Sequence, residues 1–271
     1  MITADSLTIA IATMFRENLI FLDAIIPKSI LKSINVLIVN QTDSKRQLQS
    51  VYNNITVINT SERGLANSRN MAIANITTTY AILTDDDVIF RDDLLNSIDN
   101  GFKLFPDAAV VKFKAAKTDD IPFNEYSNSP IKNLSIFGIM NVSSIELVVN
   151  IKKLKQSKAF FDDNFGLGAI FGNGLEQAFL DNVRKKKLQI AYYPKFIVSH
   201  PDDCSGRDSG SDRYYFINGA LSKKMFGSMS LLWTIVFLFF QVKQKNIKLR
   251  SVLHYYRIFR KGAQEYKKVT E

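Results

Sequence analysis

Cysteine is nearly missing from this chain of 271 residues, and its single occurrence is Cys204. One cysteine cannot form a disulfide within the chain, and its rarity fits a reducing compartment. A secretory signal peptide is not expected, because the first six residues carry no basic flank and the apolar stretch after them is short and followed by charge. The chain also lacks internal repeats, low-complexity tracts and a glycine-rich loop of the P-loop kind.

What the chain does have is the composition of a globular protein, with 46% hydrophobic and 23% charged residues. Its length suits one large domain, or one domain with an appendage. The net charge of +9 is concentrated at the C-terminal end, where residues 243–271 carry nine Lys or Arg against two Glu and so account for +7. A basic tail of this kind favours a negatively charged partner, either anionic lipid or nucleic acid.

The first half of the sequence alternates apolar runs with segments of helical composition. This order of strand and helix predicts a mostly parallel, Rossmann-like α/β sheet with helices on both faces. Ligands of such sheets bind beyond the carboxyl ends of the strands, so polar residues there can converge on one crevice. The expected strands are 7–13, 35–39, 55–58, 79–83 and 108–113, and the expected helices are 19–31, 65–74 and 92–105.

The second half is less regular. Its stretch 201–212 is short, polar and glycine-containing, and is predicted to be a mobile lid. Upstream of it we expect a polar loop over 119–133, an apolar return to the sheet over 136–149, a shaped loop over 160–174, a helix over 175–187, and strands over 190–193 and 196–199.

Three consecutive carboxylates, Asp85, Asp86 and Asp87, follow the fourth expected strand. Adjacent anions repel one another and are best tolerated at a strand end, where water or a divalent cation neutralises them. An Asp-x-Asp pair in this place can hold Mg²⁺ or Mn²⁺, with a substrate diphosphate completing the octahedron. The alternative is a solvated turn that precedes a helix capped by Asp92 or Asp93.

Residues 225–240 form an apolar segment without charge, flanked by lysines on both sides. Its sixteen residues fall short of the about 20 that a membrane-spanning helix needs, so a re-entrant or interfacial helix is favoured. The segment after it places apolar residues at helical spacing, with basic residues on the other faces. We therefore expect a C-terminal helical region, 216–271, that associates with a membrane. Packing of both segments against the domain core is the alternative.

Four further features occur in a fixed order around the acidic cluster. They are the strand over 7–13, the stretch ERGLANSRN at 62–70, the stretch FGLGAIFGNGLE at 165–176, and YYP at 192–194 followed by HP at 200–201. Together they resemble the family 2 glycosyltransferases with the GT-A fold, and more narrowly the bacterial members that build surface polysaccharides. The resemblance covers most of the chain and implies a GT-A catalytic domain over residues 1–215.

The resemblance implies a nucleotide-sugar donor held with a divalent cation, Mn²⁺ or Mg²⁺. Asp87 is the first choice for direct metal contact, and Asp85 would reach the ribose or, through water, the metal. Asp86 belongs to the same cofactor-binding group but is expected to point elsewhere and support the turn. His200 would add a nitrogen ligand or touch the diphosphate, unless it is a strand-end histidine hydrogen-bonded to backbone.

The same resemblance implies contacts to the nucleotide. Arg69 would bind a phosphate or the base edge, or else be a solvated helical arginine, and Thr13 would contact base or ribose. Relatives carry acidic residues after the second strand, where this chain has Asn40 and Gln41, with Asp43 two positions later. Gln41 can still hydrogen-bond to a pyrimidine edge, so uridine is favoured.

Glycosyl transfer also needs a general base that takes a proton from the attacking hydroxyl. Relatives place an acidic pair after a glycine, and of those acids only Glu176 remains, with Leu175 and Ala178 in place of the others. Glu176 is therefore the candidate base, unless it is only a first-turn residue favoured by the helix dipole. A single base opposite the leaving group implies inversion. If the register differs, the substitutes are Asp162, Asp163 and Asp181.

The sequence thus predicts a metal-dependent, inverting glycosyltransferase that is cytoplasmic and peripheral on the inner face of the cell membrane. Its partners would be a nucleotide-sugar donor, a lipid-linked or growing glycan acceptor and the anionic membrane surface. Nucleic acid is not expected, because the basic residues are interleaved with an apolar stripe. The alternative function is a catalytically silent relative that binds nucleotide-sugar or scaffolds polysaccharide assembly, which Leu175 and Ala178 motivate.

Overall fold

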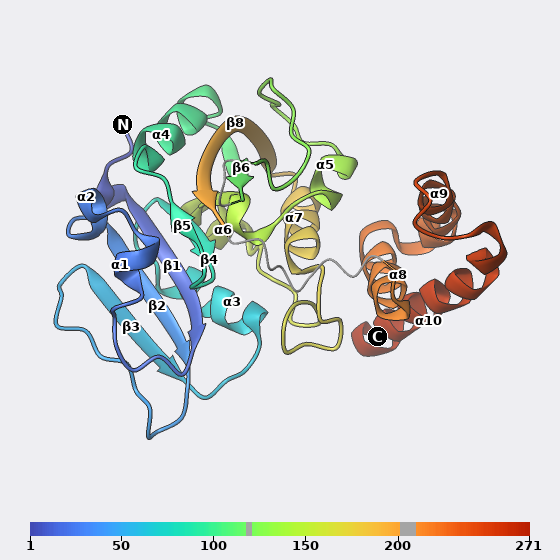
Figure 1. The fold of residues 1–271 in the computed structure, drawn as a ribbon, viewed down its shortest axis with the longest axis horizontal. Helices are drawn as coiled ribbons and strands as arrows, with labels where there is room; N and C mark the ends of the chain where they lie inside the picture. Colours follow the sequence, from blue (N-terminus) through green and yellow to red (C-terminus); the bar gives the residue numbers. More distant parts are fainter. Residues whose placement is uncertain (118–120, 201–209) are drawn as a thin grey trace. The chain divides into compact units, whose positions relative to one another are not determined.

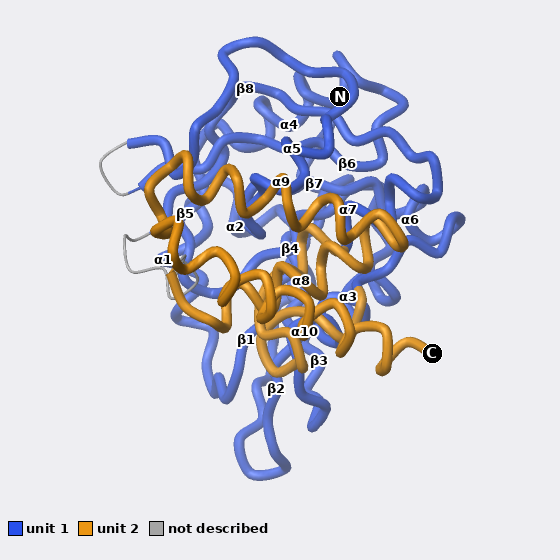
Figure 2. The backbone as a smooth tube through the Cα atoms, turned by 90° about the vertical axis from the view of Figure 1, so that its right-hand side faces the viewer, with its two compact units in different colours: residues 1–161, 179–202 blue, residues 162–178, 203–271 orange. Residues whose placement is uncertain are grey.

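The computed structural model describes residues 1–117, 121–200 and 210–271, and its backbone divides into two compact units. Unit 1 consists of Met1–Phe161 and Phe179–Asp202, and unit 2 of Asp162–Ala178 and Asp203–Glu271 (Figure 2). We expected a boundary between residues 215 and 216. The backbone instead groups the segment 162–178 with the C-terminal helices.

Unit 1 is built on one eight-stranded sheet of order β3-β2-β1-β4-β7-β6-β8-β5 (Figure 1). Its first half is parallel, as predicted, because helices or long connections return the chain between successive strands. The parallel strands are β1 (Leu7–Met14), β2 (Asn35–Gln41), β3 (Ile55–Thr60) and β4 (Tyr80–Thr84).

The second half corrects the expectation of a mostly parallel sheet, which is in fact mixed. Strand β7 (Leu147–Asn150) runs antiparallel between β4 and β6 (Ala108–Ala116). A parallel neighbour usually needs a crossover helix, and between β6 and β7 the described residues, 117 and 121–146, form only the short helix α5 (Ile136–Met140) and one 3-10 turn. Beyond β6 lie β8 (Gln189–Ser199), which is parallel to it, and β5 (Ile89–Phe90), which is antiparallel to β8.

Local sequence explains two further corrections. The helix expected over 19–31 is divided into α1 (Leu22–Ile25) and α2 (Lys28–Leu31). Pro27 forces Ile26 into an extended conformation with φ −109° and ψ 129°, which ends the first helix. The two strands expected between 190 and 199 are the single strand β8, and most of the expected lid, 201–209, lies outside the described residues.

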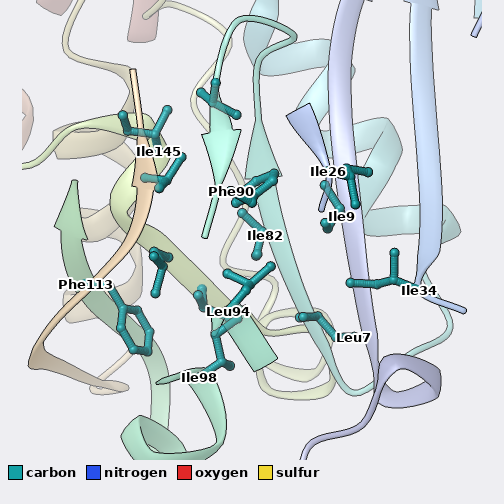
Figure 3. Close-up of a cluster of buried hydrophobic side chains, with 14 of the residues drawn as sticks. Leu7, Ile9, Ile26, Ile34, Ile82, Phe90, Leu94, Ile98, Phe113 and Ile145 are labelled. Atoms are coloured by element: carbon teal, nitrogen blue, oxygen red, sulfur yellow. The ribbon is translucent and has the colours of Figure 1, made fainter. Parts of the chain in front are cut away.

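The main hydrophobic core lies on one face of the sheet (Figure 3). Leu7 and Ile9 of β1 point into it, together with Leu94 and Ile98 of helix α4 (Leu94–Leu104). Side chains alternate along a strand, so Ala10 points to the other face, where it is also buried. That face is covered by α3 (Leu65–Asn75) near β1 and β2 and by α6 (Ile151–Ser157) near β6 and β7, so both faces carry helices as predicted. Each fully buried aliphatic side chain stabilises the folded state by about 1.5–3 kcal/mol relative to the same side chain exposed to water.

Unit 2 consists of the segment 162–178 and three helices, α8 (Asp212–Phe226), α9 (Ser230–Lys243) and α10 (Val252–Thr270). Its core contains Tyr215, Leu238 and Phe259. Helices α8 and α10 approach closely because Gly219 faces the backbone of Phe259 and Gly262 that of Phe216, where any Cβ would collide with a carbonyl group.

The apolar segment predicted over 225–240 is helical. The helical stretch 212–243 is long and apolar enough to cross a membrane, judged by length and composition alone, and only 22% of its most apolar window is buried. Several large apolar side chains of α9 are consequently exposed, and they are Leu231, Leu232, Ile235, Phe239 and Phe240.

Candidate active site

The carboxyl ends of β1, β2 and β4 meet at one edge of the sheet in unit 1. Thr13 is paired in register with Asn40 of β2, and Ile11 with Thr84 at the end of β4. The acidic cluster Asp85–Asp87 therefore begins beside the last residues of β1. This is the edge where parallel α/β sheets bind ligands.

Asp86 is held against the end of β1 by two side chains. The Thr13 hydroxyl donates to Asp86 Oδ2 at 2.6 Å, and Arg16 donates to the same oxygen from Nε at 2.8 Å, with its Nη2 at 2.6 Å. Asn40, which is fully buried, fixes the Arg16 backbone by accepting from its N–H and donating to its C=O. Asp86 thus supports the turn, as expected, through an arginine that the sequence pattern does not single out.

Asp85 contacts the buried guanidinium of Arg69. Arg69 Nη2 lies 3.2 Å from Asp85 Oδ1, and the arginine side chain is only 2% exposed. The guanidinium also lies 5.6 Å from the ring centroid of Phe161. Arg69 is therefore a fixed positive charge in α3 beside the acidic cluster, which contradicts the alternative of a solvated helical arginine.

Asp87 is the most exposed carboxylate of the cluster, with 60% of its side chain accessible. Its Oδ2 lies 3.3 Å from Nε2 of His200, whose ring stacks edge-on against Phe123. The hydrogen bond from His200 lowers the pKa of Asp87 below that of a free carboxyl group, even though partial burial opposes this. Asp87 is therefore an anion at neutral pH that faces solvent.

Asp85 and Asp87 could supply part of the coordination shell of a divalent cation. Among the described residues no group of three or more His, Cys, Asp or Glu could hold a metal ion by itself. Mg²⁺ is usually held by one or two carboxylates together with substrate phosphates and water, so a partial protein shell of Asp87 and Asp85 suits such a site. Any cation here would depend on the ligand for the rest of its coordination shell.

Gln41 and Asp43 are both engaged within the protein. The Gln41 amide donates to Ser68 Oγ at 2.9 Å and accepts from the Gly64 N–H at 3.2 Å, which fixes the start of α3. Asp43 is exposed and pairs with Arg46 at 2.6 Å, and this hydrogen bond lowers the Asp43 pKa. Their contacts to a nucleotide stay predictions.

Phe15 is a feature of this edge that the sequence pattern does not reveal. It follows β1 with a left-handed φ of 54°, a conformation that is uncommon outside glycine. The guanidinium groups of Arg46 and Arg63 lie 4.0 and 4.7 Å from its ring centroid. Two positively charged side chains thus pack against one aromatic ring beside the end of β1.

Glu176 belongs to unit 2, in the first turn of α7 (Leu175–Lys185), and is half-buried. Its neighbours Leu175 and Ala178 are buried core residues, so the acids of relatives are replaced here by packing side chains. Two alternative bases are already paired. Asp162 binds Lys224, and Asp181 is buried and binds Arg184 and Lys185.

The family model for glycosyl transferase family 2 matches residues 21–161, which is more than half of the chain and includes Arg69 and the acidic cluster Asp85–Asp87. The chain belongs to glycosyl transferase family 2. No curated protein matches it. Its fold, however, is similar to that of solved structures.

The structure of S. aureus TarS 1–349 is similar with a TM-score of 0.57 and 13% sequence identity, over 97% of this chain and 91% of that chain. The same fragment in complex with UDP-GlcNAc matches with a TM-score of 0.58 and 12% identity, over 97% and 92% of the two chains. A longer TarS structure matches over 82% of this chain and 40% of its own. At these identities the likeness shows the fold, which is consistent with GT-A.

Proposed function

We propose that this family 2 chain is a metal-dependent, inverting glycosyltransferase. It moves a sugar from a nucleoside diphosphate sugar, with uridine favoured, to a lipid-linked or growing glycan in bacterial surface polysaccharide synthesis. The observation that carries the proposal is that the three aspartates of the acidic cluster make different contacts. Asp86 is tied back to Thr13 and Arg16, Asp85 pairs with Arg69, and Asp87 faces solvent beside His200.

This arrangement suits a reaction in which a diphosphate leaves an anomeric carbon. The bond to the leaving oxygen breaks with oxocarbenium character, and negative charge accumulates on the diphosphate. Arg69 offers a buried, permanent positive charge next to Asp85. When bound at Asp87 and Asp85, a divalent cation would neutralise the remaining charge, with His200 beside it as a nitrogen ligand or a phosphate contact.

Glu176 is the proposed general base. Its carboxylate accepts the proton of the acceptor hydroxyl while that oxygen attacks the anomeric carbon from the face opposite the diphosphate. One new C–O bond forms as the old one breaks, so the anomeric configuration inverts. NMR assignment of the product anomer tests this step, and retention of configuration would contradict it.

A thermal-shift screen of nucleoside diphosphates, with and without Mn²⁺, tests the donor site. A ligand that binds only the folded state raises apparent stability by RT ln(1 + [L]/Kd), and a metal-dependent shift with one base would identify the donor class. Asp87→Asn should abolish the metal-dependent part of the shift. Asp92→Asn removes an exposed carboxylate outside the cluster and should leave the shift intact. A wild-type protein without any shift would contradict the proposal.

We further propose that unit 2 lies on the anionic inner face of the cytoplasmic membrane. The exposed apolar side chains of α9, namely Leu231, Leu232, Ile235, Phe239 and Phe240, suit the acyl boundary. The excess of +7 over residues 243–271 suits anionic headgroups, which attract each nearby Lys or Arg by about 1 kcal/mol. Nucleic acid would not satisfy the apolar face.

Vesicle flotation tests the membrane proposal. The wild type should float with vesicles containing phosphatidylglycerol, bind less to pure phosphatidylcholine, and not bind DNA. Replacing Leu232 and Phe239 together by Ser should weaken flotation at least tenfold. The control is Val51→Ser, which removes an apolar side chain of unit 1 that is 89% exposed, more than Leu232 at 57% or Phe239 at 63%. Equal loss in both variants, or tight DNA binding, would overturn the proposal.

A catalytically silent relative is the second candidate function. It is favoured by Leu175 and Ala178, because both lie in the core and neither can contact an acceptor through a carboxylate. Such a protein would bind nucleotide-sugar with the same metal dependence but would neither transfer nor hydrolyse the sugar. Turnover of the bound donor separates the two candidates.

A further inference from the structure

Asp162 is a buried junction that ties three parts of unit 2 together. Its Oδ2 lies 2.7 Å from Lys224 Nζ of α8 and accepts from the Tyr266 hydroxyl of α10 at 3.3 Å. Its Oδ1 accepts from the backbone and side-chain nitrogens of Asn164 at 3.1 and 2.9 Å. The two C-terminal helices therefore hold the start of the segment 162–178 through one carboxylate.

This ion pair is shielded from water, since the Asp162 and Lys224 side chains are 12% and 8% exposed. Burial alone would raise the Asp162 pKa, but the hydrogen bond and charge of Lys224 hold that pKa below its usual range. Removal of either partner would leave the other charge buried without its counterion, which is far more costly than loss of an exposed pair. The junction is thus sensitive to single substitutions.

Aromatic packing continues from the junction into the loop after it. Phe165 and Phe171 are fully buried, and their ring centroids lie 5.6 and 6.0 Å from that of Tyr266. Phe171 also packs against Phe216 of α8 at 5.7 Å. Hydrogen bonds from Gly166 to Phe171 and from Phe171 to Asn164 close the loop on itself. The loop is therefore fixed by the same two helices.

The loop leads directly into the turn that carries Glu176. Gly174 has a left-handed φ of 82°, and a Cβ at this position would come into contact with Phe165, Ile217 and Leu221. Leu175 fills the space beside Gly166 and is buried. Both residues before Glu176 are thus set by contacts to the loop and to α8, so the backbone from which the Glu176 side chain extends is held by unit 2.

We propose that Asp162, Lys224 and Tyr266 are positioning residues that hold Glu176 in place for the transfer reaction. This inference rests on the proposed function, and it gives the C-terminal helices α8 and α10 a role in catalysis through the placement of Glu176. Donor binding to the acidic cluster of unit 1 should not depend on these residues, whereas turnover should.

Lys224→Met tests the proposal, because it removes the charge and keeps much of the side-chain volume. We expect kcat of transfer to fall at least tenfold while the donor Kd stays within about twofold. Lys224→Arg should restore most of the activity, and Lys152→Met, which removes an exposed lysine of α6 in unit 1, should leave kcat unchanged. A fall in kcat and donor affinity together, or unchanged kcat, would overturn the proposal.

Hydrogen exchange supplies a second readout that does not need activity. The amides of 174–178 should exchange at least tenfold faster in Lys224→Met than in Lys152→Met. If the wild type transfers no sugar but this difference is seen, the proposed function fails and the positioning role stands. Unchanged exchange overturns the positioning role even if the wild type is active. Should Lys224→Met fail to fold, Asp162→Asn gives the same comparison with an uncharged group of equal size.

Discussion

Thr13 and Asp86 are joined by a hydrogen bond of 2.6 Å, although they lie at the ends of different strands and 73 positions apart in the chain. The same Asp86 oxygen binds Arg16. Three adjacent aspartates would repel one another if they shared one environment. Here the three carboxylates have separate partners, because Asp86 binds Arg16 and the end of β1, Asp85 binds Arg69, and Asp87 lies beside His200.

Arg16→Ala should weaken donor and metal binding about tenfold, because Asp86 is released and its unpaired charge disturbs Asp85 and Asp87. The folded state should lose about 1 kcal/mol or less, since the arginine is well exposed and exposed ion pairs contribute little. Isothermal titration with Mn²⁺ and donor measures the first effect, and urea unfolding the second.

Arg250→Ala, which removes an exposed arginine from unit 2, is the matched control for Arg16→Ala and should change neither quantity. Full donor affinity in the Arg16 variant would show that Asp86 needs no counterion for the site to work.

His200→Phe should raise the Asp87 pKa toward its ordinary value, because the hydrogen bond that lowers it is lost. In the wild type a depressed carboxyl pKa stabilises the folded state above the unfolded-state pKa of about 3.9, and this contribution disappears as pH falls through the lower folded-state pKa. The variant should therefore lose Mn²⁺ binding at a higher pH than the wild type.

Carboxyl ¹³C NMR of Asp87, recorded without metal, measures the shift in pKa directly. Phe123→Leu keeps the His200–Asp87 pair while changing the ring that packs on the histidine, so its Asp87 titration should stay close to that of the wild type. Identical titrations in all three proteins would remove His200 as the cause.

The strands of this protein were predictable from the sequence because apolar runs such as 7–13 and 35–39 are long and bounded by polar residues. The prediction of one helix over 19–31 was wrong, because it followed the apolar spacing and gave too little weight to Pro27, which divides the segment into two helices. The antiparallel β7 could not be foreseen, since the direction of a strand depends on how the preceding connection packs.

Within the candidate site, the acidic cluster was identified because three adjacent carboxylates are unusual at a strand end, and Arg69 was identified through the resemblance to family 2 glycosyltransferases. Arg16 and Phe15 were missed, since a single arginine or phenylalanine after a strand carries no pattern. Asn40 was noticed only as the absence of an acid, yet it holds the backbone of Arg16. Such partners are set by tertiary contacts between strands, which sequence spacing does not encode.

Glu176→Gln should lower kcat of transfer by about 10²- to 10⁴-fold, the range that general base catalysis contributes, with donor Kd unchanged. Glutamine keeps the size and hydrogen bonding of the side chain but cannot take a proton. Gln177→Glu, one position later in α7, is the matched control and should not restore activity when combined with it. Wild-type turnover in Glu176→Gln would remove Glu176 as the base.

Lys112→Met should destabilise unit 1 by about 3–5 kcal/mol, because it leaves Glu146 buried without its counterion. Lys112 Nζ lies 3.2 Å from Glu146 Oε2, and Glu146 Oε1 also accepts from Tyr126 at 2.6 Å and from Asn124 at 2.8 Å. Burial, together with the nearby Glu146 charge, raises the pKa of Tyr126, so its hydroxyl stays a donor at neutral pH.

Urea unfolding followed by circular dichroism measures the loss. Lys114→Met, two residues further along β6, changes a lysine that lies partly exposed near Tyr126 and Phe196 and should cost about 1 kcal/mol or less. Tyr126→Phe removes only the hydroxyl and therefore a hydrogen bond to a buried charge. It should lower the free energy of unfolding by about 1–3 kcal/mol, a loss between those of the two lysine variants. Equal stability of Lys112→Met and Lys114→Met would contradict the buried Lys112–Glu146 ion pair as a source of stability, so the order of the three variants tests the contribution of that pair.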